Sequence, residues 1–233
     1  MPAANLGLFK HAYERDSCGF GVIANLDDAP SHALVRIAMT SLSRLTHRGA
    51  IAADGKTGDG CGLLLKTPVG FLRSVAAEAG IELAERFASG LVFLSHDARE
   101  AGVARDTLAT QLTAQGLTLA GWRAVPVDPA ACGAEALKSL PVIAQLFVNC
   151  PAELDEAAFN RRLFMARRHA EKALEKDPVF YVPSLSASTI VFKGMVMPQY
   201  LAQFYPDLAD PRLESSVAVF HQRFSTNTLP QWR

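Results

Sequence analysis

Short apolar runs bounded by turn-forming residues alternate with stretches in which apolar residues recur at helical spacing. The short runs predict strands. They are GFGVIAN, CGLLLKT, ASGLVFLSH, LAGWRAVPV, PVIAQLFVNC and SSVAVFHQRFST. The stretch FYVPSLSASTIVFKGMV predicts two further short strands around a turn.

The helical stretches lie between these strands. Apolar residues recur at helical spacing at Leu34, Ile37, Ala38, Leu42 and Leu45, and Ser31 before them predicts an N-cap. The stretch ELDEAAFNRRLFMARRHAEKALEK predicts an amphipathic helix. Its apolar stripe consists of Phe159, Leu163, Ala166, Ala170 and Ala173. FLRSVAAEA, DAREAGVARDTLATQLTAQG and PQYLAQFY predict further helices. The alternation of strands and helices favours an α/β class.

The composition and the net charge of the chain exclude several classes of function. The chain has 233 residues, enough for one large domain or two small ones, and a formal net charge of +0. We therefore expect neither a nucleic acid nor a membrane surface as a partner. The first residues lack the apolar core of a secretory signal, and no apolar window is long enough to span a bilayer. The four scattered cysteines match neither a metal site nor a disulfide scaffold, which predicts a cytoplasmic location and no metal.

The glycine-rich stretch GAIAADGKTGDG, residues 49–60, contains Gly-Lys-Thr and suggests a phosphate-binding loop. A Walker A motif needs four residues between its first glycine and the Gly-Lys pair, whereas Gly49 and Gly55 are separated by five. The spacing therefore makes nucleotide binding the weaker interpretation. A turn between a helix and a strand is favoured. A third interpretation makes Asp54, Lys56 and Asp59 the wall of a pocket.

Cys18, in RDSCGFG, is a candidate nucleophile. A thiol with a pKa of about 8.5 needs a base or a positive field before it attacks. His47 and His221 are candidate bases. The other candidate is the α-amino group of Cys18 itself, freed by cleavage of the preceding peptide bond, since an α-amine titrates near pH 8. The alternative is a buried cysteine without a chemical role, which is the common fate of this residue.

Several motifs taken together suggest a family. ERDSCGFGVIA, LTHRGAIAADGKTGDGCGLLL and VAVFHQRFSTNTLPQWR occur in this order, separated by long gaps. The ensemble resembles the class II glutamine amidotransferases of the amino-terminal nucleophile (Ntn) hydrolase type, and among them the glutaminase domain of the large (alpha) subunit of bacterial glutamate synthase. The similarity extends from about residue 13 to Arg233. It implies an α/β (α+β) fold, a four-layer αββα sandwich that is incomplete within this sequence.

The resemblance also implies roles for individual residues. Cys18 matches the amino-terminal nucleophile, which makes residues 1–17 a propeptide and residues 18–233 the amino-terminal part of the amidotransferase domain. Arg48 matches the arginine that supports the amino end of the nucleophile. Arg223 matches the arginine that binds the α-carboxylate of L-glutamine, and Thr226 matches a nearby substrate contact.

The implied reaction is hydrolysis of glutamine through a cysteinyl thioester. In the family, the released ammonia reaches 2-oxoglutarate in another part of the large subunit. The resemblance places FMN and an iron–sulfur cluster there, NADPH as the electron donor and FAD in the small (beta) subunit. It implies no cofactor in residues 1–233.

The family's oxyanion donors form an Asn-Gly pair within a His-Asn-Gly-Glu stretch, and no His-Asn-Gly occurs in this sequence. Loss of one oxyanion donor costs about 10²–10³ in rate. We therefore expect little or no glutaminase activity from these 233 residues alone. The alternative function is a non-catalytic remnant that acts only as a folding or interaction module.

Overall fold

The computed structural model describes residues 18–225 and 229–232. The strands are β1 Gly19–Ala24, β2 Thr57–Lys66, β3 Phe87–Leu94, β4 Thr118–Ala124, β5 Val142–Asn149, β6 Thr189–Val196 and β7 Val217–Gln222. The α-helices are α1 His32–Ser43, α2 Val69–Glu78, α3 Ala98–Ala114, α4 Ala134–Leu137, α5 Glu156–Ala173 and α6 Leu201–Phe204. Short 3₁₀ helices are η1 Thr46–Arg48, η2 Pro129–Ala131, η3 Pro198–Tyr200 and η4 Pro206–Ala209.

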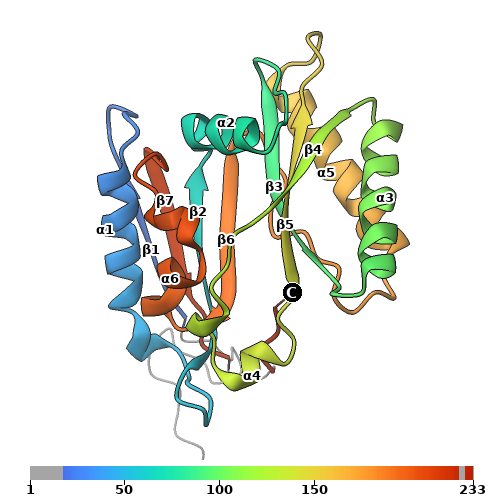
Figure 1. Cartoon of the computed structure of the whole chain (residues 1–233). Helices are drawn as coiled ribbons and strands as arrows, with labels where there is room; N and C mark the ends of the chain where they lie inside the picture. Colours follow the sequence, from blue (N-terminus) through green and yellow to red (C-terminus); the bar gives the residue numbers. More distant parts are fainter. Residues whose placement is uncertain (1–17, 226–228, 233) are drawn as a thin grey trace, which may run out of the picture.

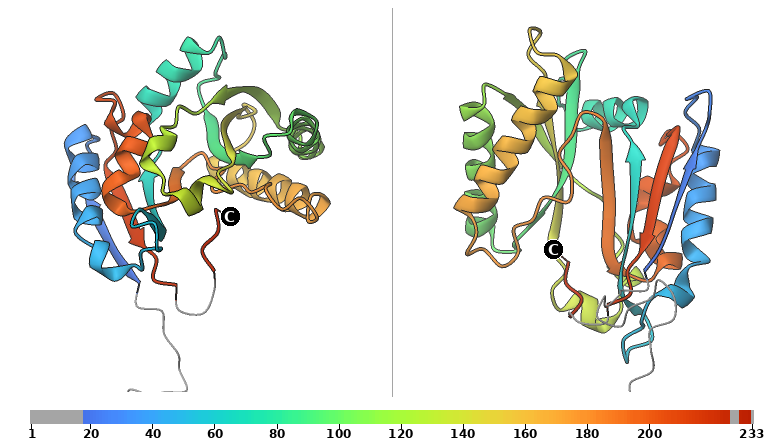
Figure 2. Two further views of the ribbon diagram at one scale, coloured as in Figure 1. Left: turned by 60° about the horizontal axis from the view of Figure 1, so that its bottom comes forward. Right: turned by 180° about the vertical axis from the view of Figure 1, so that it is seen from behind.

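The strands form two antiparallel sheets. One has four strands in the order β1-β7-β2-β6, and the other has three in the order β3-β5-β4. Figures 1 and 2 show α1 and α6 beside the four-stranded sheet and α3 and α5 beside the three-stranded one. This mixed α/β architecture is consistent with the expected Ntn-hydrolase sandwich.

The predicted helix boundaries have identifiable physical causes. The Ser31 hydroxyl accepts a hydrogen bond from the Leu34 amide at 3.2 Å and caps α1, as predicted. Asp97 and Asp155 cap α3 and α5 in the same way. Gly116 follows α3 with a φ of 69°, a backbone conformation that favours glycine.

Two hydrophobic clusters hold the molecule together. The first joins α1, α2 and α6 to one face of the four-stranded sheet and reaches one face of the three-stranded sheet. The second fills the space between the other face of the three-stranded sheet and helices α3 and α5. The three-stranded sheet is therefore covered on both faces, and all eight residues of β3 are buried.

The four-stranded sheet is covered differently at β1 and β7. Phe20 and Val22 of β1 are 78% and 66% exposed, and they lie opposite His221 and Val219 of β7. The described residues leave this face of the two strands open, whereas the opposite face packs on α1. The open face is where the candidate site is built.

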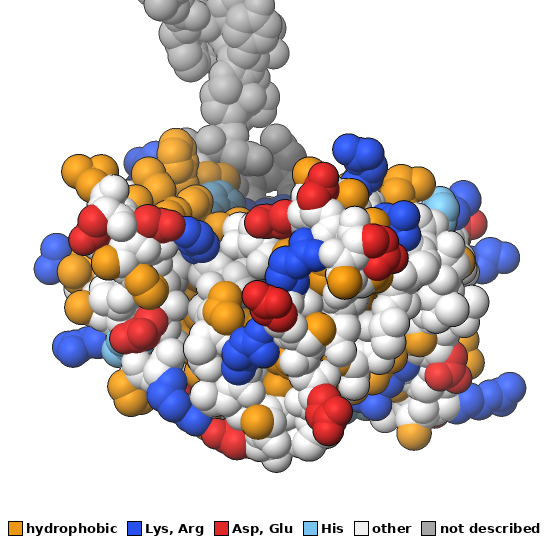
Figure 3. Space-filling model, turned by 90° about the horizontal axis from the view of Figure 1, so that it is seen from above, with side chains coloured by type: hydrophobic (Ala, Val, Ile, Leu, Met, Phe, Trp, Pro, Cys, Tyr) orange, Lys and Arg blue, Asp and Glu red, His pale blue; other side chains and the backbone are white. Residues whose placement is uncertain are grey.

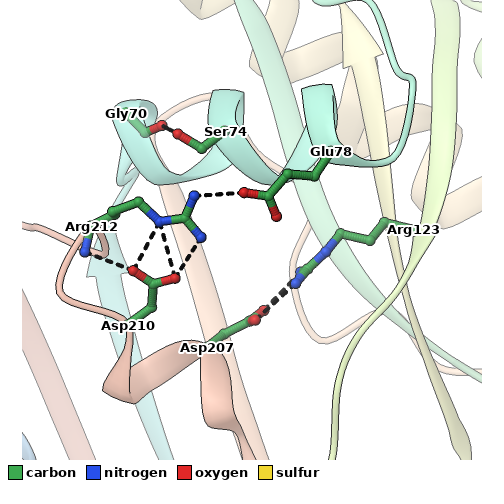
Figure 4. Close-up of polar contacts among 7 residues, drawn as sticks. All are labelled: Gly70, Ser74, Glu78, Arg123, Asp207, Asp210 and Arg212. Atoms are coloured by element: carbon green, nitrogen blue, oxygen red, sulfur yellow. Dashed lines mark hydrogen bonds and ion pairs between the residues drawn. The ribbon is translucent and has the colours of Figure 1, made fainter.

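A buried ion pair ties the three-stranded sheet to the η4 segment. Arg123 of β4 donates two hydrogen bonds of 2.8 Å to the carboxylate of Asp207, as Figure 4 shows. Arg123 also donates to Gln145 of β5 at 3.0 Å, and Gln145 donates to the hydroxyl of Ser89 at 2.9 Å. Because each member has a partner, this network satisfies its own buried polar groups.

The end of the molecule that carries α2 has basic and acidic side chains interspersed over its surface (Figure 3). This mixture agrees with the net charge of +0 and shows no one-signed patch on that face. Among the helices of residues 18–225 and 229–232, none has the length and hydrophobicity that a bilayer crossing requires.

Three predictions about local structure need correction. FYVPSLSASTIVFKGMV forms one strand, β6, because residues 181–186 make only isolated bridges to β3. The strand predicted at CGLLLKT begins earlier, at Thr57, so the glycine-rich stretch is strand from Thr57 to its end at Gly60. Ala173 is exposed although Phe159, Leu163, Ala166 and Ala170 are buried, because α5 ends there.

Candidate functional site

Cys18 lies immediately before β1, an edge strand of the four-stranded sheet (Figure 1). Its side chain is half-buried. The backbone amide of Phe224 donates to Cys18 Sγ at 3.4 Å, and Sγ lies 3.9 Å from the Phe224 carbonyl oxygen. The thiol is thus held by the segment that follows β7, and it is not enclosed in the apolar core.

Arg48 is brought to Cys18 by the 3₁₀ turn that follows α1. A side chain at Gly19 would meet Cβ and Cγ of Arg48 at 3.1 Å, so the stem of Arg48 packs directly on the residue after Cys18. Gly49 is equally constrained, since a Cβ there would lie 1.9 Å from Nε2 of Gln222. Two glycines therefore allow the HRGA segment, β1 and β7 to approach closely.

Arg223 lies on the other side of Cys18. Gly19 pairs with Gln222, so the next position of this antiparallel ladder places Cys18 opposite Arg223. The amide of Arg223 donates to the carbonyl oxygen of Gly60 at 3.0 Å, which continues the β7–β2 pairing. Thr226, the other predicted substrate contact, lies outside the described residues.

Asp59 joins the two segments that carry the arginines. One of its carboxylate oxygens accepts from the amide of Ala50 at 3.0 Å and from the amide of Ser225 at 2.7 Å. Ala50 follows the Arg48 turn and Ser225 follows Arg223, while Asp59 itself is buried. Charge-assisted hydrogen bonds of this kind fix both segments relative to each other.

A cavity of about 500 Å³ opens between β7, β2 and β6, and it is lined by Asp59 and Arg223 but not by Cys18 or Arg48. Its floor includes Gly60 and Gly62 of β2, which carry no side chain. Arg223 and His221 line it from β7, and Lys193 lines it from β6. Glycines on the middle strand therefore leave room between basic side chains on the two flanking strands.

The basic side chains of the cavity influence one another. Burial, and then the charge of Arg223, lowers the pKa of Lys193 to about 8. The same two causes lower the pKa of His221. The cavity therefore brings the basic side chains of Arg223 and Lys193 together with the carboxylate of Asp59.

The other three cysteines have a different environment from Cys18. Cys61, Cys132 and Cys150 are buried and free. Burial raises the pKa of the Cys61 thiol to about 12 and that of Cys132 to about 11, and it also raises the pKa of Cys150. Residues 18–225 and 229–232 contain no group of three or more His, Cys, Asp or Glu side chains that could hold a metal ion.

The third interpretation of the glycine-rich stretch holds for only one of its residues. Asp59 lines the cavity. Asp54 instead accepts hydrogen bonds from Thr57 and from the amide of Glu135, and Lys56 donates to the carbonyl oxygen of Ala130. Lys193 was not identified from the sequence. The available signal was a lysine within the apolar strand VFKGMV.

Comparisons with known proteins give a consistent result. A family model described as "Glutamine amidotransferases class-II" matches residues 18–233 and thus begins at Cys18. The chain is 37% identical over 234 residues to the large chain of glutamate synthase [NADPH] from Bacillus subtilis (strain 168), covering 100% of this chain and 15% of that protein. It is 40% identical over 225 residues to the large chain of glutamate synthase [NADPH] from Azospirillum brasilense, covering 94% and 15%.

A third relative, ferredoxin-dependent glutamate synthase 2 from Synechocystis sp. (strain ATCC 27184 / PCC 6803 / Kazusa), is 40% identical over 221 residues, with 94% of this chain and 14% of that protein covered. The chain therefore spans about a seventh of the length of the curated relatives that it matches.

Proposed function

Because the chain belongs to the class II glutamine amidotransferases, we propose that Cys18 is the nucleophile that hydrolyses glutamine. The observation that carries this proposal is the position of Cys18 in the β1–β7 ladder, opposite Arg223, which lines the 500 Å³ cavity, and next to Gly19, on which Arg48 packs. A half-buried thiol at the start of a strand is open to a substrate in a way that Cys61, Cys132 and Cys150 are not.

The reaction begins with cleavage of the peptide bond after Ser17, which removes residues 1–17 as a propeptide. The freed α-amine takes the thiol proton, and the thiolate attacks the side-chain amide carbon of glutamine. The ammonium returns its proton to the departing nitrogen, and ammonia leaves a γ-glutamyl thioester on Cys18. Water, activated by the same amine, then attacks the thioester and releases glutamate.

Two arginines assist this sequence in different ways. Arg223 lies opposite Cys18 and lines the cavity, which supports a role for its guanidinium as the forked pair of donors that holds the α-carboxylate of glutamine. Arg48 packs on Gly19 and supports the strand end that bears the new amine. Thr226 is proposed as a further substrate contact.

In the longer protein, we propose that the ammonia is transferred to 2-oxoglutarate and that the remaining large chain and the small subunit supply the reducing chemistry. That part would use FMN, an iron–sulfur cluster, FAD and NADPH. The described residues do not fit an iron–sulfur cluster, which needs several thiolates together, since no metal-binding group is found among them. We propose that these groups are bound by other segments of the longer protein, and no step here depends on them.

Two measurements test the proposal. Intact-mass analysis of the protein is expected to show a chain that begins at Cys18. Incubation with the electrophilic glutamine analogue 6-diazo-5-oxo-L-norleucine is expected to add one label, which peptide mapping places on Cys18. Cys18→Ala should abolish the labelling, and the matched control Cys150→Ala should keep it.

A label on another cysteine, or none in a folded protein that starts at Cys18, would contradict the proposal and favour a non-catalytic module. The prediction that residues 1–233 alone turn over little glutamine is checked by a glutaminase assay against the intact natural polypeptide. Thermal stabilisation by ATP would instead favour the nucleotide-binding interpretation of residues 49–60.

A further inference from the structure

Lys193 is a cation for which the described residues provide no acidic partner. Its Nζ lies 4.5 Å from the centroid of the Tyr181 ring, and no ion pair joins it to a carboxylate within residues 18–225 and 229–232. The side chain is half-buried and lines the same cavity as Arg223. Partial burial of an ammonium without a counter-ion is unfavourable unless a ligand supplies the negative charge.

Lys193 and Arg223 lie on the same face of the sheet. Arg223 directly follows β7 and lies two positions after His221, His221 pairs with Gly62, and Gly62 pairs with Lys193. Only a glycine therefore separates the β7 and β6 side chains in this row. The two cations repel each other across the gap, which is one cause of the lowered Lys193 pKa.

We propose that Lys193 is a second cationic contact for the α-carboxylate of the substrate, so that this group is held between Arg223 and Lys193. The inference rests on the proposed glutaminase function and adds a binding residue to it. A carboxylate placed between the two cations removes their mutual repulsion and gives Lys193 the partner that it lacks.

The dimensions of the sheet agree with this assignment. Cys18 and Lys193 are separated by three strand spacings of about 4.8 Å and by two residues along the strands, about 7 Å. The thiol spans only a small part of this gap. The remaining distance is spanned by the flexible four-carbon stem of Lys193 and by an extended glutamine molecule between this lysine and Cys18. The lysine head thus reaches the end of the substrate farthest from the attacked amide.

The proposed contact requires a ligand that carries an α-carboxylate. An amide without an α-carboxylate would bring no negative charge to Arg223 and Lys193, so the site should discriminate against it. Lys193 thereby determines which primary amides bind productively and leaves the thiol chemistry itself unchanged.

The experiment measures the rate of Cys18 alkylation in the intact natural polypeptide with two electrophiles. The first is 6-diazo-5-oxo-L-norleucine, which carries the α-carboxylate, and the second is iodoacetamide, which lacks it. For Lys193→Met we expect the half-saturating concentration of the first reagent to rise about tenfold, as loss of a hydrogen bond to a charged group predicts. The iodoacetamide rate should stay at the wild-type value.

Two further variants separate binding from folding. Lys193→Arg keeps the charge and is expected to restore part of the affinity. Lys66→Met removes a lysine of β2 whose ammonium pairs with Asp28 at the surface, and it should leave both rates unchanged. Thermal melting of each variant checks that the variant still folds.

The pH dependence supplies a readout that a structural role would not affect. The groups that face Lys193 around the cavity are Arg223, His221, Tyr181 and Asp59. In the wild type, the half-saturating concentration should rise above about pH 8, where free Lys193 loses its proton. The Lys193→Met variant should lack this additional pH dependence. The α-amine of the reagent titrates in the same way with both proteins, so comparing the two proteins removes its contribution.

The possible failures are distinguishable. If the wild type is labelled on Cys18 and Lys193→Met saturates at the same concentration with the same pH profile, the proposed glutaminase function stands and the role of Lys193 is refuted. If the wild type is not labelled at all, the proposed function fails and the role of Lys193 fails with it. If iodoacetamide slows as much as the glutamine analogue, Lys193 acts on the thiol and not on the carboxylate.

Discussion

The two sheets of this protein differ in how many of their faces are covered. Helices α3 and α5 cover one face of the three-stranded sheet and the first hydrophobic cluster covers the other, so every residue of β3 is buried. In the four-stranded sheet, β1 and β7 are covered on the α1 side only, and Phe20 and Val22 stay exposed. The candidate chemistry lies entirely in the sheet with an open face.

The two sheets therefore differ in how much of their surface contributes to apolar burial. A fully covered sheet excludes water and gains free energy from apolar burial, but it offers no room for a substrate. The four-stranded sheet buries less apolar surface, because one face of β1 and β7 is open. At Gly60 and Gly62 it also omits the side chains that would fill the space beside Arg223 and Lys193. The two glycines thereby leave a space for a ligand beside these two side chains.

The largest expected effect distinguishes a cysteine of each sheet. Cys18→Ala should reduce the glutaminase kcat of the intact polypeptide by a factor on the order of 10⁶, as removal of a nucleophile does elsewhere. Cys150→Ala, next to β5, should leave kcat unchanged and affect only stability, because Cys150 is buried against the second cluster. Steady-state glutaminase kinetics measure both. Equal losses in the two variants would remove the functional distinction between the sheets.

The next largest effect concerns stability, and it is seen by removing one aromatic ring beside the three-stranded sheet and one on the open face of the four-stranded sheet. Phe159→Ala removes a buried ring between α5 and the three-stranded sheet and should lower the free energy of unfolding by about 3–5 kcal/mol. Phe20→Ala, on the open face, should change it by less than about 0.5 kcal/mol. Urea denaturation of both variants gives the values. A large cost at Phe20 would mean that this face is covered in solution.

The buried Arg123–Asp207 pair tests how firmly the three-stranded sheet is attached to the η4 segment (Figure 4). Asp207→Ala leaves the guanidinium of Arg123 without its carboxylate and should cost about 3 kcal/mol of stability. The double variant Arg123→Met with Asp207→Ala should recover part of the loss, because no unpaired charge remains. Denaturation of the single and double variants measures the coupling, and an additive result would argue against a buried pair.

A smaller effect is expected at Asp59 of the open sheet. Asp59→Asn removes the charge that holds the amides of Ala50 and Ser225, so kcat/KM for glutamine should fall about tenfold. Asp54→Asn is the matched control, since Asp54 binds backbone amides nearby without lining the cavity. It should lower stability and keep kcat/KM near the wild-type value. An equal fall in kcat/KM in the control would make the role of Asp59 purely structural.

The smallest effect concerns His221. Burial and the charge of Arg223 lower its pKa in the folded state, whereas an unfolded histidine titrates near pH 6.5. The unfolded state therefore binds more protons below that pH, and His221 makes the protein less stable as the pH falls. His221→Gln should flatten this part of the pH dependence, measured by urea denaturation at pH 7.5 and 5.5. The same slope in both proteins would contradict the assignment.

Local patterns in the sequence predicted much of the fold. The cap at Ser31, the buried stripe of α5 up to Ala170 and the strand at GFGVIAN are confirmed, because each depends on near neighbours in the chain. The second strand predicted before Thr189 is wrong, since residues 181–186 bridge to β3, which is far away in the sequence. Lys193 was missed for the same reason, because only the β2–β6 register places it in the cavity.

The sequence by itself determined the α/β class and the family, because the motifs that carry them are contiguous. From the same motifs it proposed Cys18, Arg48 and Arg223 as site residues. Only the tertiary structure decided which cations share a cavity and that Asp59 joins the two arginine-bearing segments. It also decided which sheet face stays open. Those facts depend on strand order and register, and residues that pair across a sheet are far apart along the chain.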